Sequence, residues 1–232
     1  MDRYKKLFGV LGIAGAFLLL TAVVLAAIFN KGGLLPLNSF MNELGLYSGS
    51  YFTASFTLLF NLSLALFGLL FGAMFVYNGI CEATLKPTVL GFFGALTGIL
   101  ATAQAVFTIN LTEYHYIVSG AFYCSFFILT MLYAVFSFMQ RGRKQYVSIF
   151  TAVLSGLCGG AFGGFILTNG MADYLIQAAS MSSRSGIMPF ALIGWAAMLF
   201  MLAFTVQYGV YMIKGPKSLA ERLNKIDREI EL

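Results

Sequence analysis

Long apolar segments, each free of Asp, Glu, Lys and Arg, alternate with more polar connections along the whole chain. Each is about 20 residues or longer, which is the length that an α-helix needs to cross the hydrocarbon core of a bilayer. The pattern predicts six membrane-spanning helices, over Leu7–Phe29, Tyr51–Tyr77, Val89–Thr108, His115–Met139, Val147–Thr168 and Ile187–Ile213. We therefore expect an all-α, polytopic membrane helical bundle in which residues 1–213 form one transmembrane domain.

The composition agrees with a membrane protein and excludes a water-soluble fold. Hydrophobic residues make up 59% of the 232 residues and charged residues only 10%, whereas soluble domains contain roughly 25% charged residues. A soluble protein of this size could not cover so much apolar surface. The first apolar segment follows basic residues, as a signal peptide would, but its 23 residues indicate a span that is retained.

The distribution of Lys and Arg predicts how the spans are oriented. Three of the five connections are nearly free of them and hold only Lys31 and Arg184. The other cations lie in the amino end, the second and fourth connections and the tail: Arg3, Lys5, Lys6, Lys86, Arg141, Arg143, Lys144, Lys214, Lys217, Arg222, Lys225 and Arg228. Because such residues are retained on the cytoplasmic side, we expect a multi-pass cell-membrane protein with both termini cytoplasmic.

Residues 214–232 differ from the rest of the chain. Ser218 and Glu221 fit a capping box, and apolar residues then recur at helical spacing. This predicts a cytoplasmic amphipathic helical tail, which would be a membrane anchor or a self-association element.

Glycines recur every three or four residues within three spans. They are Gly68 and Gly72, then Gly91, Gly94 and Gly98, and then Gly156, Gly160 and Gly164. Small residues at this spacing let two helix backbones approach closely in lipid. We predict that they mark helix–helix contacts, with a glycine-lined lipid groove as the alternative.

Polar residues gather near the membrane boundary opposite to most of the cations. They are Ser39, Asn42, Glu43, Asn61, Gln104, Glu113, His115 and Asp173. A carboxylate and a histidine together can act as general acid and base, so Glu43 and His115 are the catalytic candidates. A lone histidine at a helix start is also typical of a capping or interfacial residue.

The candidate ligand-binding residues are Asn61, Ser39, Asn42 and Gln104. A side-chain amide inside the apolar layer is costly unless it is paired. For Asn61 we expect first an interhelical hydrogen bond, to Gln104 or Ser119, and second a ligand contact.

Several kinds of chemistry have no support in the sequence. The chain contains one histidine, no Cys or His spacing typical of metal sites, and no phosphate-binding loop or nucleophile elbow. Cys81 falls in a predicted connection and Cys124 and Cys158 in spans, so no disulfide framework is expected. We predict no metal and no cofactor. The net charge of +5 comes from residues at helix ends, so nucleic acid is not expected as a partner.

Several short segments resemble the family known as domain of unknown function 998, within the wider Frag/DRAM/Sfk group of six-span membrane proteins. The matching residues are Asn38-Ser39-Phe40-Met41-Asn42-Glu43-Leu44-Gly45, Leu59-Phe60-Asn61-Leu62-Ser63, and Gly98 to Phe107 followed by His115, Gly120, Ala121 and Phe126. The resemblance implies a six-helix bundle with polar residues at its outer face, and it carries over Glu43, Asn61 and His115. Asn42 departs from the pattern, which usually has serine before the acidic residue. Some relatives are linked to lipid-anchor remodelling or lipid handling.

These features favour a protein that binds or remodels a membrane lipid or lipid-linked molecule at the extracytoplasmic interface. They leave open whether it is an enzyme. The alternative is a non-catalytic structural or accessory subunit of a membrane complex, with a membrane-protein partner or a second copy of the chain. A small-solute transporter ranks third, because the inner halves of the spans hold few polar residues.

Overall fold

The computed structural model describes residues 3–29, 39–46, 51–108, 110–139, 147–170 and 187–214, without the side chains of 51–53, 112–113 and 169–170. Its long helices are α1 (Arg3–Phe29), α2 (Tyr51–Glu82), α3 (Leu85–Val106), α4 (Thr112–Met139), α5 (Ile149–Phe165) and α7 (Pro189–Lys214). A short 3-10 helix, η1 (Met41–Gly45), follows α1, and a π-helical turn, η2 (Ile166–Gly170), continues α5. Each of the six long helices is long and apolar enough to cross a membrane, where the fifth span is α5 together with the first part of η2. This confirms the prediction of an all-α, six-span bundle.

The helices extend beyond the predicted spans at their charged ends. α1 begins at Arg3 rather than Leu7, and α2 continues past Tyr77 to Glu82. Hydropathy marks only the apolar part of a helix, whereas the helix itself continues until the backbone turns. As a result the charged residues Lys5 and Glu82 are helical.

Two helix boundaries differ from the prediction for local reasons. α2 ends before Ala83, which has a φ of 44°, a left-handed value that does not continue a helix. Cys81, predicted in a connection, therefore lies in the last turn of α2, where it is exposed. α7 begins at Pro189 rather than Ile187, since proline suits the first helical position. The predicted tail helix lies outside the described residues and stays a prediction.

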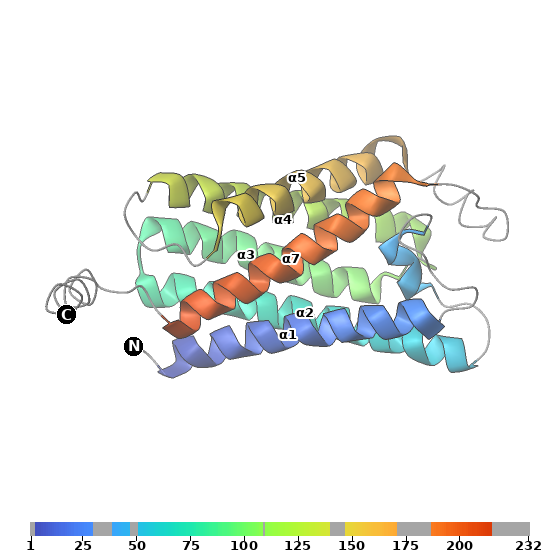
Figure 1. Ribbon diagram of the computed structural model, residues 1–232, viewed down its shortest axis with the longest axis horizontal. Coiled ribbons are helices and arrows are strands. Elements are labelled where there is room, and N and C mark those ends of the chain that lie inside the picture. The colour runs from blue at the N-terminus through green and yellow to red at the C-terminus, as the bar shows by residue number, and fades with distance from the viewer. Residues whose placement is uncertain are drawn as a thin grey trace, which may run out of the picture.

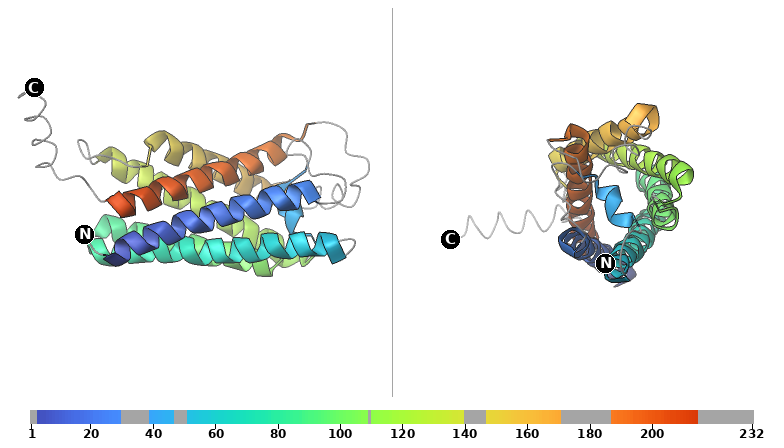
Figure 2. Two further views of the ribbon diagram at one scale, coloured as in Figure 1. Left: turned by 60° about the horizontal axis from the view of Figure 1, so that its bottom comes forward. Right: turned by 90° about the vertical axis from the view of Figure 1, so that its right-hand side faces the viewer.

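The six long helices form a closed ring. Each packs against the one before it in the chain, and α7 closes the ring against α1. Figure 2 shows this ring end-on, with η1 inside it. α1 starts and α7 ends at the same end of the bundle (Figure 1), which we call the Lys5 end, and η1 lies at the other, the η1 end.

Aromatic side chains fill the centre of the ring. Phe75 of α2 stacks on Tyr208 of α7 with ring centroids 4.1 Å apart. Phe204 of α7 meets Phe126 and Tyr133 of α4 edge-on, at centroid distances of 6.1 and 5.4 Å. Apolar burial between helices gains little in lipid, which is itself apolar, so close packing of this kind has to hold the bundle together.

α2 and α3 pack with their backbones almost in contact. A Cβ built on Gly98 would overlap the carbonyl oxygen of Gly68, and one built on Gly68 would lie 2.6 Å from the carbonyl oxygen of Gly98. Thr102 of α3 donates a hydrogen bond across the same interface to the carbonyl oxygen of Ala65, at 3.2 Å. The predicted use of glycines for helix contact is therefore confirmed at this interface.

Gly98→Ala is expected to lower the free energy of unfolding by about 1–3 kcal/mol, because a methyl group forced between two backbones pushes α2 and α3 apart. Gly164→Ala is the matched control, since nothing lies within 4 Å of a Cβ at that position. Equilibrium unfolding in mixed detergent micelles measures both. Equal stability of the two variants would contradict the close approach of α2 and α3.

Candidate functional site

The short helix η1 is inserted into the mouth of the ring. Every residue from Ser39 to Gly45 is buried, and the Glu43 side chain is 0% exposed. The turn forms backbone hydrogen bonds of its own, since Glu43 N donates to Phe40 O and Leu46 N donates to Glu43 O. The Glu43 carboxylate caps the same turn by accepting the Phe40 N–H at 3.0 Å. The apolar side chains of Met41 and Leu44 allow such a turn to enter the bundle.

Four helices hold η1 and its flanking residues in place. Phe40 stacks against Phe162 and Phe165 of α5, with centroids 6.1 and 5.9 Å apart. Hydrogen bonds from the other three helices are Trp195 Nε1 to Ser39 O at 2.8 Å, Gln104 Nε2 to Asn42 Oδ1 at 3.3 Å and Thr57 Oγ1 to Leu46 O at 3.3 Å. These contacts fix η1 as part of the bundle rather than as a surface loop.

Three buried polar atoms around this end have no hydrogen-bond partner among the described residues. They are Asn61 Nδ2 on α2, Gln104 Oε1 on α3 and Tyr123 Oη on α4. The three side chains are 6%, 3% and 1% exposed. Asn61 lies against η1, because a Cβ at Gly45 would be 3.0 Å from its Oδ1. The interhelical hydrogen bond predicted for Asn61 is not formed: Gln104 bonds to Asn42 instead.

His115 has partners at both ring nitrogens. Nδ1 lies 2.6 Å from the carbonyl oxygen of Phe107 and therefore donates to it, so Nε2 accepts from the Ser119 hydroxyl at 3.2 Å. The ring is 3% exposed and ties the start of α4 to the end of α3. Neither ring nitrogen is hydrogen-bonded to Glu43. In this arrangement His115 orients the chain, and a proton transfer would require it to exchange a partner.

The structure thus brings most of the predicted site residues together. Ser39, Asn42 and Glu43 belong to the buried η1 segment, and Asn61 and Gln104 contact it. His115 lies at the same end of the bundle with other partners. Of the remaining residues of this predicted group, Asp173 and the side chain of Glu113 lie outside the described part of the chain.

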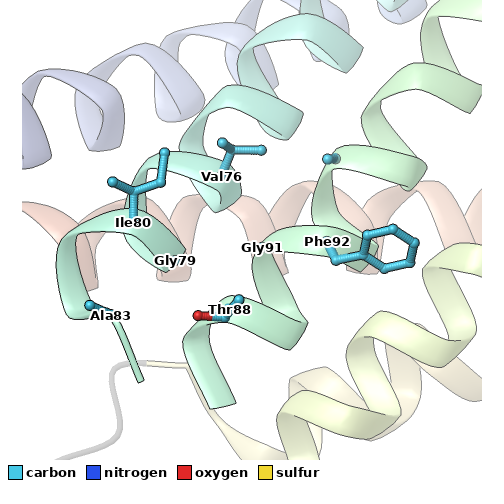
Figure 3. Close-up of a pocket in the computed structure, with 8 residues that line it drawn as sticks. Val76, Gly79, Ile80, Ala83, Thr88, Gly91 and Phe92 are labelled. Atoms are coloured by element: carbon cyan, nitrogen blue, oxygen red, sulfur yellow. The ribbon is translucent and has the colours of Figure 1, made fainter. Parts of the chain in front are cut away.

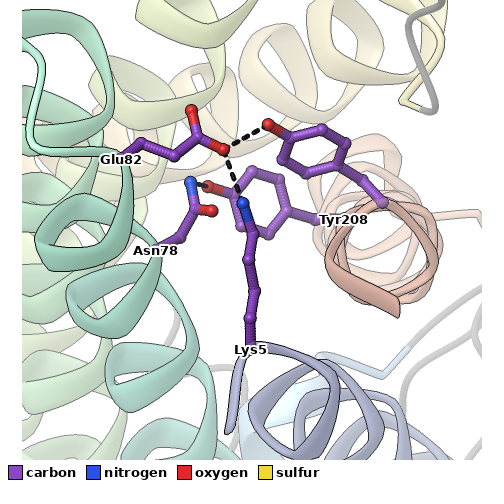
Figure 4. Close-up of polar contacts among 5 residues, drawn as sticks. Lys5, Asn78, Glu82 and Tyr208 are labelled. Carbon is purple, nitrogen blue, oxygen red and sulfur yellow. Dashed lines mark hydrogen bonds and ion pairs between the residues drawn. The ribbon is translucent and has the colours of Figure 1, made fainter. Parts of the chain in front are cut away.

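A second polar cluster, at the Lys5 end, was not predicted from the sequence (Figure 4). Lys5 of α1 forms an ion pair with Glu82 of α2 at 2.6 Å, and the Tyr211 hydroxyl of α7 donates to the same carboxylate oxygen at 2.5 Å. One turn earlier on α2, Asn78 Nδ2 donates to Tyr208 Oη at 2.8 Å. The four-residue spacing of Asn78 and Glu82 places both on one face of α2, and this was the signal in the sequence.

An apolar groove of about 490 Å³ lies between α2 and α3 near the Lys5 end (Figure 3). It is lined by Val76, Gly79, Ile80, Ala83, Thr88, Gly91, Phe92 and Ala95. Ile80 and Phe92 are 68% and 66% exposed, so the groove opens outward, as a surface covered by lipid chains does. Gly79 and Gly91 line this groove, which lies beside the helix contact between α2 and α3; that lipid occupies it stays a prediction.

A closed ring of six apolar helices around a buried short turn defines a multi-pass membrane protein with a cluster of buried polar side chains at one end. No protein-family model, curated protein or solved structure matches this chain. The resemblance to the domain of unknown function 998 therefore stays a prediction, carried by the residues given above.

Lys5→Met is expected to lower the free energy of unfolding by about 1–3 kcal/mol, because it leaves the Glu82 carboxylate without its cation. The double variant Lys5→Met/Glu82→Gln should lose less than the sum of the two single variants, by at least about 0.5 kcal/mol. Lys6→Met, at an exposed neighbouring position, is the control. Strict additivity in this double-mutant cycle would show that the pair does not stabilise the Lys5 end.

Proposed function

We propose that this protein binds the polar part of a membrane lipid or lipid-linked molecule at the η1 end of the bundle. The observation that supports this most directly is the group of unpartnered, buried polar atoms of Asn61, Gln104 and Tyr123. Leaving such atoms without a partner costs about 1–3 kcal/mol each. A ligand that supplies the missing hydrogen bonds would explain why polar residues occupy positions where leucine would give a more stable ligand-free protein.

The ligand's apolar part follows from the surroundings. Outside the ring the long helices carry exposed large apolar side chains over their length, so a molecule that reaches the η1 end from the side arrives through the bilayer. In this proposal Asn61 and Gln104 contact the head group directly. Ser39, Asn42 and Glu43 shape and hold η1, and His115 fixes the turn between α3 and α4.

Binding is a better-supported role than catalysis for these residues. Glu43 caps its own turn, and His115 is engaged at both nitrogens. Remodelling of a bound lipid would require His115 to release either Phe107 or Ser119. The resemblance to six-span proteins linked to lipid handling agrees with either form of the proposal.

We further propose that the η1 end is extracytoplasmic, in a cell membrane. Among the described residues, all Lys and Arg lie at the Lys5 end: Arg3, Lys5, Lys6, Lys86 and Lys214. Positive residues are retained on the cytoplasmic side during insertion. The polar site would then lie on the side of the outer leaflet.

Lipid retention tests the proposed binding. Native mass spectrometry of protein purified in a mild detergent is expected to show bound lipid, and the double variant Asn61→Leu/Gln104→Met should lose most of it, because both contacts to the head group are gone. Thr130→Val is the control, since its buried hydroxyl bonds only within α4. Unchanged lipid retention in the double variant would remove this site from consideration.

Cysteine labelling tests the proposed orientation. Cys81 is exposed at the Lys5 end, so a membrane-impermeant maleimide should label it only after cells are permeabilised. Asn110→Cys at the η1 end, in a Cys81→Ser background, should be labelled in intact cells. The reverse pattern would place the site on the cytoplasmic side.

A second function has one observation in its favour. The complete engagement of His115 by backbone and Ser119 is what a purely structural residue shows, and it fits a non-catalytic accessory subunit of a membrane complex. In that case the lipid-retention experiment would give the same result for the double variant and the control.

A further inference from the structure

We infer that the head group bound at the η1 end is uncharged and carries hydroxyl groups, as glycerol and sugars do. This inference rests on the proposed function and specifies its ligand class. The atoms that carry it are Asn61 Nδ2, Gln104 Oε1 and Tyr123 Oη, none of which has a partner among the described residues.

The unpartnered atoms are a donor, an acceptor and a phenol that can be either. They come from three helices that neighbour one another in the ring. Tyr123 is linked to η1 through aromatic contacts, since its ring lies edge-on to Phe162 at 4.8 Å and Phe162 stacks on Phe40. A group that only donates or only accepts would leave part of this set unsatisfied.

Hydroxyl groups can form hydrogen bonds with all three atoms, whichever way the amide groups of Asn61 and Gln104 are turned. Turning the Asn61 or Gln104 amide over exchanges its oxygen for its nitrogen, but one polar atom of the amide still faces the same position. A hydroxyl group both donates and accepts, so it pairs with whichever atom is presented. A site built to hydrogen-bond hydroxyl groups also rejects analogues that lack them.

The charges at this end disfavour a phosphate. Recognition of phosphate normally uses Arg, Lys or the N-terminus of a helix. The described residues place no Lys or Arg at the η1 end, and the helices that carry Asn61 and Tyr123 begin well before those residues, at Tyr51 and Thr112. The only charged side chain that they place there is the carboxylate of Glu43, which is fully buried. One oxygen of Glu43 accepts the Phe40 N–H, so this carboxylate caps η1.

A ligand with hydroxyl groups also explains why Asn61 is present although its amide nitrogen has no partner among the described residues. An unpaired amide in an apolar bundle is a cost that replacement by an apolar side chain of similar size would remove. Asn61→Leu should therefore leave the ligand-free protein as stable as before or more stable, while it removes ligand binding. If Asn61 served the structure alone, Asn61→Leu would lower the stability of the ligand-free protein.

Lipid-induced stabilisation of purified, delipidated protein tests the inference. The detergent should be an amine oxide, which has no hydroxyl or sugar head group to compete. The probes are diacylglycerol and a monoglycosyl diacylglycerol, compared with phosphatidate and phosphatidylethanolamine of the same acyl chains. We expect the two neutral lipids to raise the melting temperature by at least about 2 °C and the two phosphate-bearing lipids to have no such effect.

Variants assign any shift to the site. Asn61→Leu should abolish the response to neutral lipids without lowering the melting temperature of the lipid-free protein, and Gln104→Met provides a second variant if the first does not fold. Asn78→Leu is the matched control on the same helix: it removes a hydrogen bond to Tyr208, so it should lower the melting temperature and keep the lipid response.

The outcomes separate the inference from the proposed function. A response to phosphatidate or phosphatidylethanolamine that Asn61→Leu abolishes would overturn the neutral head group and leave lipid binding at η1 intact. If no lipid produces a response that depends on Asn61 or Gln104, lipid binding at this site falls together with the inference.

Discussion

The stacking of Phe75 on Tyr208 joins α2 to α7 across the centre of the ring, and most of the other features follow from the need to fill that centre. Six helices arranged in a ring leave a space along their common axis, which side chains have to fill. Phe126, Tyr133 and Phe204 complete the filling at mid-height. The chain then has to close each end separately, because none of the long helices that the structure describes runs along the axis.

The two ends are closed by different means. At the η1 end a short turn enters the ring and brings Asn42 and Glu43 into an apolar bundle. The turn forms backbone hydrogen bonds of its own and uses the Glu43 carboxylate as a cap, as irregular backbone at membrane depth requires. At the other end an ion pair and a tyrosine hydroxyl join α1, α2 and α7. Charged and amide side chains therefore concentrate at the ends of the axis, and aromatic rings occupy the middle.

The architecture could be predicted from sequence because the bilayer imposes it. The length of each apolar segment fixes the number of helices, and the glycine spacing indicates close contact, which the overlap between Gly68 and Gly98 confirms. The grouping of Ser39, Asn42, Glu43, Asn61 and Gln104 at one end also followed from their positions relative to the spans.

The partners of individual residues could not be predicted in the same way. The insertion of η1 depends on the space inside the ring, which no local pattern encodes. Lys5 and Glu82 meet only because α1 and α2 run antiparallel, side by side, with their charged ends level. Gln104 pairs with Asn42 rather than with Asn61 because η1 places Asn42 within hydrogen-bond distance of it. Such contacts belong to the tertiary structure, and hydropathy carries no information about them.

Closure of the ring by the last helix has a consequence for biogenesis. α7 supplies Trp195, which holds η1, and Tyr208 and Tyr211, which pair with residues of α2. Until α7 leaves the ribosome and enters the bilayer, Asn78 and Glu82 lack these partners, and the earlier helices surround an open seam. A nascent chain arrested before α7 would therefore expose polar groups to lipid, and membrane quality-control proteases could distinguish it from the finished protein by that seam.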